Sequence, residues 1–588
     1  MFKTLIKMAS PIQHDPQHYR GLVDMGSNGI RFSITSLQPP TQRIMPTLYQ
    51  HRAGISLYDA QYSESGERVP IDQATIKAVI ASFKQFKRTC QDFEVPDKHI
   101  TVLATEATRT AINSEDFRAQ IKQKVGWDVT MLPKEDEGRV GAMGIASSLP
   151  EVSGLVMDLG GGSTQLSWLI KRGDTHGVQM PESGAVSMPY GAAAMSRRLA
   201  EAERNGTTAQ LKKEIKTAVT DAYATLKVPA ELEAAAQKSG GFTLYLSGGG
   251  FRGWGYVLMS QHRVQPYPIP AINGFKVSRR EFLSTDQVKA AAAKSLETGG
   301  ESELFRISER RAGQVPAVAL LVNVLAEALP QVKEVRFCQG GVREGYLFSS
   351  LSEEIRAQYP LVVATQPLAS HSSAPLVELL LASLPEGPTN GAVDDYKSIF
   401  VPELLEAFAN LIYHHSSHSK DLQASAALRT TTSGVLAGVH GITHEARTLI
   451  ALLLCARWGG SIPPCDEPFK RTLEQLADSP WTLWWINYIG AVAALISGVH
   501  PSGVRDADRL QLRASWGQDE KRRQVLSLHA TITADVDEDV FGVDAHGVEK
   551  VGKRKRWIGG RDGIGHRAAV DITAADGRTL TRSIEKDE

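Results

Sequence analysis

Apolar and polar positions alternate along two short stretches of the chain that share one pattern. An apolar run leads into each stretch, an acid and several glycines follow, and the alternation resumes after them. Alternation with a period of two is typical of a strand with one buried face. Residues 21–34 and 154–170 therefore each predict a hairpin made of a strand, a tight glycine-rich turn and a second strand.

The rest of the chain up to residue 350 predicts strands that alternate with helices. Apolar residues recur at helical spacing in several segments, and a capping residue precedes the helix that opens near residue 113 or 114. The other expected helices are 71–90, 134–148, 209–226, 317–329 and 342–348. The expected strands are 100–104, 129–132, 242–246 and 334–338. This alternation predicts an α/β fold, with a first lobe at 20–152 and a second at 153–350.

The pattern changes twice after residue 350. Residues 360–392 are rich in proline, serine and alanine, which predicts a linker over 351–394. A helical domain is expected over 395–515, with helices at 404–413, 444–457 and 479–497 among others. From residue 521 the period returns to two between glycine-rich turns, which predicts a small β-containing domain over 521–588.

Composition is that of an ordinary globular protein. The 588 residues carry no formal net charge, 42% of them are hydrophobic and 22% are charged, which argues against nucleic-acid binding and disorder. Four scattered cysteines suit a reducing compartment. The first 20 residues lack the apolar core of a secretory signal, and the apolar runs 449–456 and 489–496 are shorter than a bilayer requires. We expect a cytoplasmic protein without membrane contact, and a homodimer is compatible with these data.

The acids and glycines of the two hairpin turns indicate a phosphate site. Glycine lets the backbone approach a ligand closely, and successive turn amides can cradle one anion. Asp24 and Asp158 begin the turns, where a carboxylate repels phosphate but suits a Mg²⁺ ion beside it. Because the turns match in register, they indicate two related lobes closing on one phosphate chain. The candidate phosphate-binding residues are Gly26, Ser27, Asn28, Gly29, Arg31, Gly160, Gly161, Gly162, Ser163, Thr164 and Gln165.

Two further glycine-rich turns follow the strands expected at 242–246 and 334–338. Each turn lies directly before a predicted helix, whose first amides have no partner within the helix and can bind a phosphate or a sugar. The candidate nucleotide-binding residues are Gly248, Gly249, Gly250, Gly340 and Gly341.

Taken together, these motifs resemble the exopolyphosphatase/guanosine-pentaphosphate phosphatase (Ppx/GppA) family. The family pattern appears in matching order and spacing as Asp24-Met-Gly-Ser-Asn-Gly, Ala104-Thr-Glu-Ala-Thr-Arg109, Asp136-Glu137-Gly-Arg139, Asp158-Leu-Gly-Gly-Gly-Ser-Thr164 and Gly341-Val-Arg-Glu-Gly-Tyr346. The resemblance implies a two-lobe, actin-like ATPase fold, related to ribonuclease H, over residues 20–350. The length and the extended C-terminal region look most like the fungal retrograde-response regulators, which signal mitochondrial state to nuclear genes.

The resemblance implies roles for four charged side chains. Glu137 matches the catalytic glutamate, which can deprotonate the attacking water. Asp158 and Asp24 match acids that hold a metal ion, here Mg²⁺, and Arg109 matches an arginine near the phosphate. Each residue also has a structural alternative, because an aspartate can cap its own turn and an arginine can form a surface ion pair. The implied catalytic residues are Glu137, Asp158 and Arg109.

Gln165 departs from the family pattern. Exopolyphosphatases generally have a glutamate at this place in the second hairpin. Related apyrase-type nucleotidases also have glutamine here, so hydrolysis stays open. The amide can orient a water molecule but cannot take its proton, which makes cleavage of long polyphosphate chains a less secure expectation.

The helical region resembles a degenerate form of the family's C-terminal domain, related to metal-dependent His-Asp phosphohydrolases. No His-Asp pair stands near its histidines, and Gly441 argues for a loop, so polar surface is the favoured interpretation. These histidines are His414, His415, His418, His440 and His444.

Two further features of the C-terminal half have structural interpretations. The basic run 553–556 beside Trp557 favours a solvated turn, with nucleic acid, polyphosphate or nuclear import as alternatives. A stripe of aromatic residues at helical spacing predicts core packing or a domain contact. Its members are Trp481, Trp484, Trp485 and Tyr488.

Two functions of different class remain open from the sequence. The first is a phosphoanhydride hydrolase that binds polyphosphate, guanosine penta- or tetraphosphate or a nucleoside triphosphate with Mg²⁺ between the lobes, where Glu137 activates water. The second is a nucleotide-sensing regulator of mitochondria-to-nucleus signalling that acts through protein partners, with weak or vestigial hydrolysis. Gln165 and the missing His-Asp pair favour the second. Transfer of phosphate to a sugar is a third option, for which no sequence feature identifies a pocket.

Overall fold

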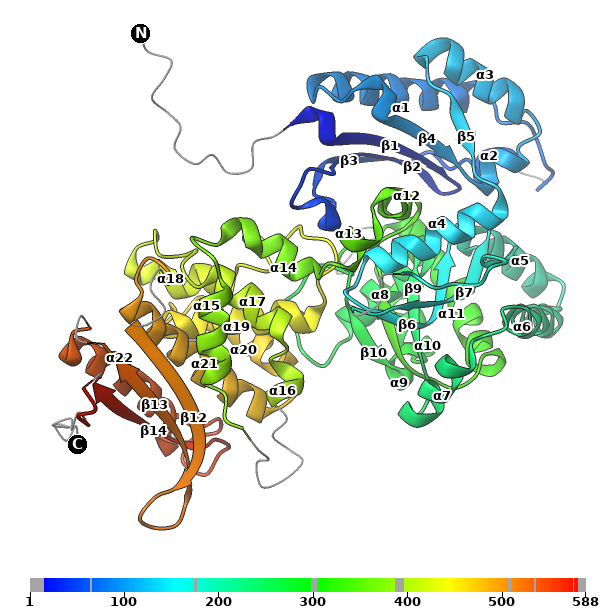
Figure 1. The fold of residues 1–588 in the computed structure, drawn as a ribbon. Helices are drawn as coiled ribbons and strands as arrows, with labels where there is room; N and C mark the ends of the chain where they lie inside the picture. Colours follow the sequence, from blue (N-terminus) through cyan, green and yellow to red (C-terminus); the bar gives the residue numbers. More distant parts are fainter. Residues whose placement is uncertain are drawn as a thin grey trace, which may run out of the picture. The chain divides into compact units, whose positions relative to one another are not determined.

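The computed structural model describes eight stretches of the chain, which form two compact units (Figure 1). The first unit is the described part of Met1–Pro360 together with Gly438–His444. The second is the described part of Leu361–Ala437 and Glu445–Glu588. The segment Gly438–His444 thus belongs with the first unit, although both its sequence neighbours belong with the second. The described residues are 15–63, 66–173, 177–297, 304–386, 396–504, 509–533, 536–574 and 576–579.

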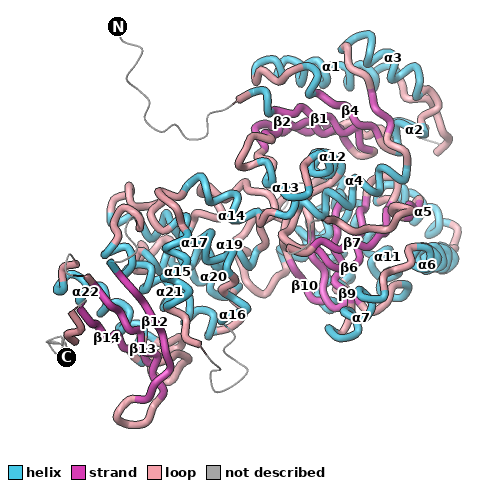
Figure 2. The backbone as a smooth tube through the Cα atoms, in the orientation of Figure 1, coloured by secondary structure: helices cyan, strands magenta, loops and turns pink. Residues whose placement is uncertain are grey.

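The first lobe is built on a five-stranded sheet in the order β3-β2-β1-β4-β5. β1, β2 and β3 are antiparallel neighbours, whereas β1, β4 and β5 are parallel. Figure 2 shows β2, β1 and β4 side by side. The apolar stripe of α1 covers the sheet, and Phe83 and Phe86 pack against Phe32 of β2. The elements are β1 Tyr19–Gly26, β2 Gly29–Ser36, β3 Thr47–Ala53, α1 Gln73–Asp92, β4 Ile100–Ala104, α2 Glu106–Thr110, α3 Ser114–Val125 and β5 Val129–Met131.

The second lobe repeats this arrangement in a six-stranded sheet of order β10-β11-β9-β6-β7-β8. β6, β7 and β8 form the antiparallel part, and β6, β9 and β11 run parallel. The strands are β6 Val152–Leu159, β7 Thr164–Lys171, β8 Val186–Met188, β9 Phe242–Ser247, β10 Lys276–Ser278 and β11 Val332–Phe337. The helices from α4 onward are α4 Lys134–Ser147, α5 Ala192–Arg204, α6 Thr208–Thr225, α7 Ala230–Ser239, α8 Gly248–Ser260, α9 Arg279–Phe282, α10 Thr285–Glu297, α11 Glu309–Ala328 and α12 Val342–Ser350.

The two sheets share one topology. Strands β3, β2, β1, β4 and β5 of the first lobe correspond in order to β8, β7, β6, β9 and β11 of the second. Both predicted hairpins, β1–β2 and β6–β7, occupy the centre of this repeat. The fold is therefore the α/β, actin-like two-lobe fold that the resemblance implied.

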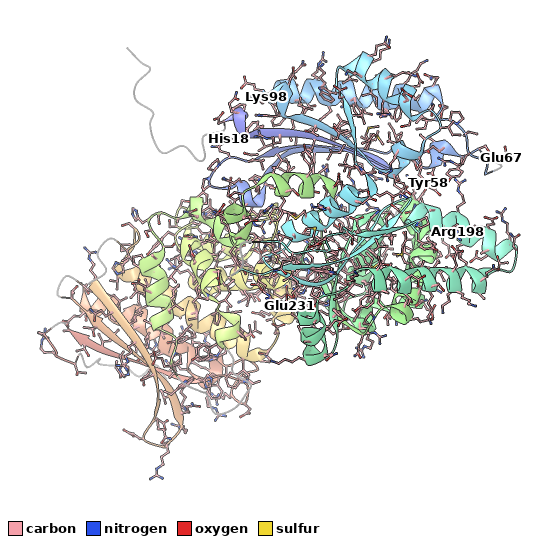
Figure 3. The ribbon with its side chains drawn as sticks, turned by 45° about the vertical axis from the view of Figure 1, so that its right-hand side comes forward. His18, Tyr58, Glu67, Lys98, Arg198 and Glu231 are labelled. Atoms are coloured by element: carbon pink, nitrogen blue, oxygen red, sulfur yellow. The ribbon has the colours of Figure 1, made fainter. Side chains whose placement is uncertain are left out.

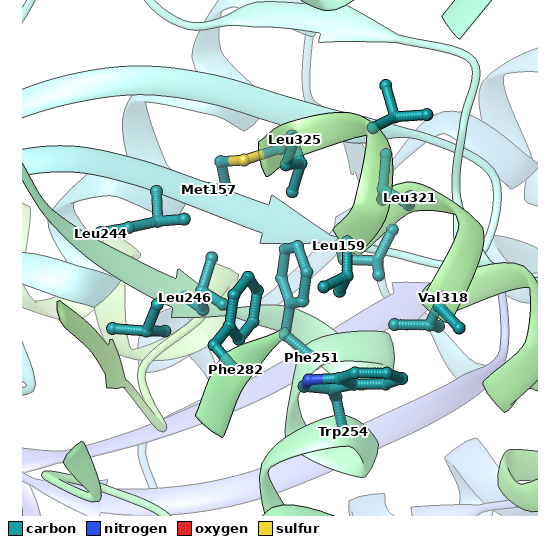
Figure 4. Packing of buried hydrophobic residues seen from close by; sticks show 14 of the residues in the cluster. Met157, Leu159, Leu244, Leu246, Phe251, Trp254, Phe282, Val318, Leu321 and Leu325 are labelled. Atoms are coloured by element: carbon teal, nitrogen blue, oxygen red, sulfur yellow. The ribbon is translucent and has the colours of Figure 1, made fainter. Parts of the chain in front are cut away.

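The second lobe has a continuous apolar core between its sheet and its helices. Met157, Leu159 and Leu246 from the sheet face α8 and α11, as Figure 4 shows. Phe251 and Trp254 of α8 fill the space between them, at 0% and 1% exposure. This packing holds the glycine turns at the ends of β6 and β9 in fixed positions.

Helix α11 begins earlier than the sequence predicts. The expected helix opened at residue 317, whereas the structure begins it at Glu309 and keeps Pro316 inside. Proline normally ends or kinks a helix because it lacks the N–H donor. The early turns matter because they carry Arg310 and Arg311, which contribute to the cavity described below.

Helices α4 and α12 cross at glycines. A β-carbon at Gly345 would overlap the carbonyl oxygen of Val140, and one at Gly144 would overlap the carbonyl oxygen of Gly341. Only residues without a side chain allow this approach of two backbones. The crossing fixes α4, whose first turn carries Glu137.

The stretch predicted as a linker is largely helical, so that prediction was wrong over 353–382. The structure forms α13 Glu353–Ala357, α14 Pro360–Thr365 and α15 Ala374–Ala382 there, while 387–394 lies outside the described residues. Proline occupies the first or second position of α15, where its missing N–H costs nothing. Prolines that were interpreted as breaks therefore mark helix starts.

Helices dominate the second unit up to residue 499. They are α16 Tyr396–Ile399, α17 Pro402–Leu411, α18 Lys420–Leu428, α19 His444–Arg457, α20 Glu467–Leu476 and α21 Pro480–Val499. A three-stranded sheet of order β12-β13-β14 follows, with α22 beside it. Its elements are β12 Leu510–Gln518, β13 Gln524–Ile532, α22 Glu538–Val551 and β14 Arg567–Ala574. The first strand begins inside the range 395–515 predicted as helical, where Leu510, Leu512 and Ala514 alternate with polar or exposed positions.

By length and composition, α21 is the one helix in the described stretches that could cross a membrane. Its apolar window is 72% buried inside the structure. Trp484, Trp485 and Tyr488 are each fully buried, and their rings contact one another. The aromatic stripe is thus core, as the sequence suggested.

The α4–α12 crossing generates a test of stability. Gly345→Ala places a methyl group against the backbone of α4, so we expect the free energy of unfolding of the first unit to fall by at least about 2 kcal/mol. Gly313→Ala is the control, since its added β-carbon meets nothing within 4 Å. The control should be neutral or stabilising by up to ~1 kcal/mol, as helix propensity favours alanine. Urea unfolding measures both, and equal effects would contradict the close-crossing interpretation.

Candidate functional site

A cavity of about 220 Å³ lies between the two lobes of the first unit. Both hairpin turns line it, together with the first residues of α8 and α12. Its ionisable side chains are three acids and five arginines. They are Asp24, Glu137, Asp158, Arg31, Arg52, Arg252, Arg310 and Arg311.

The two hairpin turns meet across this cavity. A β-carbon on Gly161 would lie 2.7 Å from the side chain of Asn28, so the second turn approaches the first only because it is glycine. Eight of the predicted phosphate-binding residues line the cavity: Gly26, Ser27, Asn28, Gly29, Arg31, Gly160, Gly161 and Ser163.

Three other predicted phosphate-binding residues lie outside the cavity lining. Gly162 packs against the carboxylate of Glu106, where a β-carbon would lie 2.5 Å from its Oε2. Thr164 is fully buried and donates its hydroxyl proton to the carbonyl oxygen of Asp158 at 3.2 Å. Gln165 faces a neighbouring cavity. The first two residues therefore support the turn rather than face a ligand.

In the two later glycine-rich turns, too, only some of the predicted residues line the cavity. Gly248, Gly249 and Gly341 line the cavity, whereas Gly250 packs against Leu159 and Gly340 packs against the backbone of α4. Gly248 has φ +89°, and a β-carbon there would lie 2.6 Å from Oδ1 of Asp158. The first amides of α8 thus begin directly beside this carboxylate, at the positive end of a helix dipole.

Glu137 lies in the first turn of α4 and faces the cavity. Arg109 of α2 donates to its Oε2 at 3.2 Å and also donates to the carbonyl oxygen of Leu132. Burial raises the pKa of Glu137 to about 7, although the guanidinium of Arg109 opposes this rise. Arg109 itself does not line the cavity, so in this structure it orients Glu137.

Asp24 and Asp158 occupy equivalent places in the two hairpins. Asp24 is paired across the strands with Arg31, whose Nη1 lies 3.8 Å from its Oδ2. Burial raises the pKa of both carboxyl groups, to about 6 for Asp158, where Arg31 and a hydrogen bond from Ser247 act in the opposite direction. Like-charge repulsion acts in the same direction as burial. Asp24 raises the pKa of Asp158, and Asp158 raises the pKa of Glu137.

These two acids suit a divalent cation, although no group of three or more His, Cys, Asp or Glu residues gathers to hold a metal in the described stretches. Mg²⁺ prefers few protein carboxylates and completes its shell with waters and phosphate oxygens. Two buried carboxylates facing a cavity that has room for a ligand match that preference.

Gln165 faces a smaller cavity of about 40 Å³ beside the main one. Glu137 and Asp158 line both cavities. The amide of Gln165 donates to Oγ of Ser163 at 2.9 Å, which fixes its orientation. A space of this size is large enough for a water molecule with polar partners.

Sequence reasoning missed four of the five arginines. Arg52 is opposite Arg31 in the β2–β3 register, and Arg252 lies one turn into α8, so both could have been found from alternation or helical spacing. Burial lowers the pKa of Arg252 and of Arg311 to about 10, and neighbouring arginines act in the same direction. Nε of Arg252 is buried without a hydrogen-bond partner among the described residues. Such a cluster favours an anionic ligand.

Arg310 joins the two lobes. It donates to Oδ1 of Asn28 at 2.5 Å, to Oγ of Ser56 at 2.8 Å and to Oδ2 of Asp59 at 3.0 Å. A second contact lies at the edge of the lobes near Tyr58, which is labelled in Figure 3. There the guanidinium of Arg197 lies 5.9 Å from the ring centroid of Tyr58 and 4.0 Å from that of Tyr62. These bonds hold the lobes together around the cavity.

Three of the five histidines considered as metal ligands bond other side chains. His415 bonds Thr430, while His440 bonds Ser147 and His444 bonds Tyr267. Gly441 has φ +93° in a loop, as its presence suggested. The basic run at Arg554–Arg556 is an exposed single turn of 3₁₀-helix, and Arg554 pairs with Asp562.

The duplicated fold is that of an actin-like protein, and sequence comparison identifies the family. Residues 36–354 match the Ppx/GppA phosphatase family, and residues 359–575 match the RTG2 C-terminal domain. The chain belongs to the Ppx/GppA phosphatase family, in its fungal retrograde-regulation branch.

The chain is similar to two curated proteins and one solved structure in particular. The chain is 42% identical to retrograde regulation protein 2 of Saccharomyces cerevisiae over 496 residues, which cover 83% of this chain and 82% of the relative. It is 24% identical to exopolyphosphatase 1 of Mycobacterium leprae over 261 residues, or 43% of this chain and 69% of the relative. The Aquifex aeolicus PPX-GPPA enzyme aligns with a TM-score of 0.43 at 22% identity, over 56% of this chain and 99% of that one.

The raised pKa of Glu137 predicts a pH-dependent stability. The folded chain holds this proton more tightly than the unfolded chain, so the resulting stabilisation is present below pH ~4.5 and is lost as the pH rises through about 7. Glu137→Gln removes this loss. Relative to wild type, its free energy of unfolding should therefore increase by about 2–3 kcal/mol between pH 5 and pH 8.

Urea unfolding at several pH values measures this difference. Glu135→Gln is the matched control, because Glu135 lies exposed in the same helical turn. The difference in free energy of unfolding between the control and wild type should be the same at every pH. A constant difference for Glu137→Gln as well would contradict the burial of an ionisable carboxyl group there.

Proposed function

We propose that the first unit hydrolyses the terminal phosphoanhydride bond of polyphosphate, a guanosine penta- or tetraphosphate, or a nucleoside triphosphate. The observation that carries this proposal is Glu137, a half-buried carboxyl group whose pKa is raised to about 7 and which shares one cavity with two further acids and five arginines. A general base with a pKa near the working pH is the most effective. Relatives named exopolyphosphatase and guanosine-5'-triphosphate,3'-diphosphate pyrophosphatase support the substrate class.

Different residues of the cavity bind the phosphates and the metal ion. Turn amides and the first amides of α8 bind phosphate oxygens, and the arginines neutralise the remaining charge. Asp24 and Asp158 would hold Mg²⁺, which would supply positive charge to neutralise phosphate oxygens. Their raised pKa values indicate that an anionic pair here gains from a cation.

Glu137 takes the proton of the attacking water. Arg109 holds the carboxylate in place from behind, outside the cavity. The side chain of Gln165 orients the same water through the smaller cavity that it shares with Glu137. Because phosphoryl transfer needs mainly positioning and charge stabilisation, one base and a cationic cavity are sufficient.

A nucleotide-sensing regulator is the second candidate function. Gln165 in place of an acid and the 42% identity to retrograde regulation protein 2 favour it. In this case ligand binding would change the closure of the lobes, and protein partners would respond to the change. The cytoplasmic location stays a prediction in either case.

Removing the base should separate the two functions. Glu137→Gln should lower Mg²⁺-dependent phosphate release from polyphosphate, pppGpp and ATP by at least ~100-fold, because it removes the one carboxylate of the cavity that is not assigned to the metal ion. Glu135→Gln should leave release unchanged. Release that persists in Glu137→Gln would exclude this base, and binding without release in wild type would establish the sensor.

The arginine cluster should control affinity in both functions. Arg252→Met should weaken the binding of inorganic tripolyphosphate with Mg²⁺ by about 10- to 100-fold, since it removes a charge-assisted contact. Arg306→Met is the control, because Arg306 is exposed and lies outside the cavity lining. Titration calorimetry measures both. Equal affinity for the two variants would show that the ligand binds elsewhere.

A further inference from the structure

The segment Gly438–His444 connects two parts of the chain that belong to the second unit, yet it packs with the first. His444 anchors one end of it. Nδ1 of His444 lies 2.7 Å from the hydroxyl of Tyr267, and Nε2 lies 2.8 Å from the carbonyl oxygen of Ala271. The neutral tautomer that donates to Ala271 and accepts from Tyr267 satisfies both contacts.

A tight backbone contact holds the residue next to His444. Gly274 has φ +84°, and a β-carbon there would lie 2.6 Å from Cα of Thr443. At the other end of the segment, Nε2 of His440 lies 2.8 Å from Oγ of Ser147, the last residue of α4. The segment is therefore held at three points on the first unit.

Behind the segment lies a buried polar network. Asn273 is its central residue, at 3% exposure. Its amide donates to the carbonyl oxygen of Ser148 at 2.8 Å and to that of Ile442 at 3.4 Å, and its Oδ1 accepts from the backbone of Gln339 at 3.0 Å. One side chain thus contacts the segment, the end of α4 and a turn that lines the cavity.

The network continues from that turn to the acids. The N–H of Gly340 donates to Oγ of Ser148 at 2.9 Å, and Oγ of Ser247 donates to the carbonyl oxygen of Gly340 at 2.6 Å. Ser247 is also paired with Asp158 across the parallel strands β9 and β6. Ser148 and Ser247 are at most 1% exposed, so water does not replace these bonds.

We propose that Gly438–His444 is a positioning strap for the cavity, which couples the second unit to Asp158 through Asn273, Ser148 and Ser247. The strap is covalently continuous with the second unit at both ends, so a change there displaces it. Displacement removes a partner from Asn273 and loosens the Gln339–Gly341 turn. This inference rests on the proposed function for its consequence, because it assigns regulation of the same site.

Hydrogen exchange of the full chain without ligand tests the coupling independently of any activity. Gly274→Val drives the strap from its seat, and we expect at least fivefold faster exchange at 438–444 and also at 247–250 and 339–345. Ser247→Ala should increase exchange at 438–444, because coupling is reciprocal. Asn113→Ala is the matched control. Asn113 also bonds backbone groups, in this case those of Ile71 in the first lobe, so its loss should leave all three segments unchanged.

Kinetics provides the second readout. His440→Ala should lower kcat for inorganic tripolyphosphate with Mg²⁺ about tenfold with KM within twofold, whereas His440→Gln, which keeps a polar nitrogen, should recover most of the rate. Faster exchange confined to 438–444 would overturn the proposed strap, whatever the activity. If wild type releases no phosphate, the proposed hydrolysis fails, and the exchange experiment alone decides on the strap.

Discussion

Charge confined between the two lobes is the constraint on which the rest of the structure depends. Three acids and five arginines line one small cavity, and the buried carboxyl groups and guanidinium groups have pKa values displaced toward their neutral forms. Such a cavity is stable only when opposite charges balance locally, since a buried charge without a partner is costly. A phosphate chain bound with a divalent cation would supply negative charge to the arginines and positive charge to the acids. The charges that line the cavity therefore favour this class of ligand independently of any single contact.

Backbone proximity is what makes this concentration of charge possible. Gly161 allows the second turn to touch Asn28, and Gly248 allows α8 to begin beside Asp158. The crossing of α4 and α12 at Gly144 and Gly345 places Glu137 at the same cavity. In each case a side chain would force two backbones apart. Glycine at these positions thus determines the geometry of the acids as much as the acids determine the chemistry.

The sequence pattern predicted those strands, turns and helices that are determined by residues nearby in the chain. The hairpins around Asp24 and Asp158, the helix with Glu137 and the presence of two related lobes followed from periodicity and turn residues, and the resemblance supplied the fold. Arg310 and Arg311 were not predictable in this way, because they come from a helix start hidden by Pro316, and the contacts of Arg310 lie in the other lobe. The supposed linker failed for a related reason: a proline at a helix start and a proline in a loop look alike in sequence.

Hydrolysis and sensing make different demands on one cavity, and the structure explains why the family pattern can serve both. Hydrolysis needs Glu137 and a water beside it, a local requirement that one substitution removes. Sensing needs only that ligand affinity differs between two arrangements of the lobes. Arg310 supplies such a difference, because its bonds to Asn28 and Asp59 exist only while the lobes are close. Closure of the lobes can thus be conserved even when Glu137 no longer acts as a base. The polar network behind Asp158 would still transmit this closure.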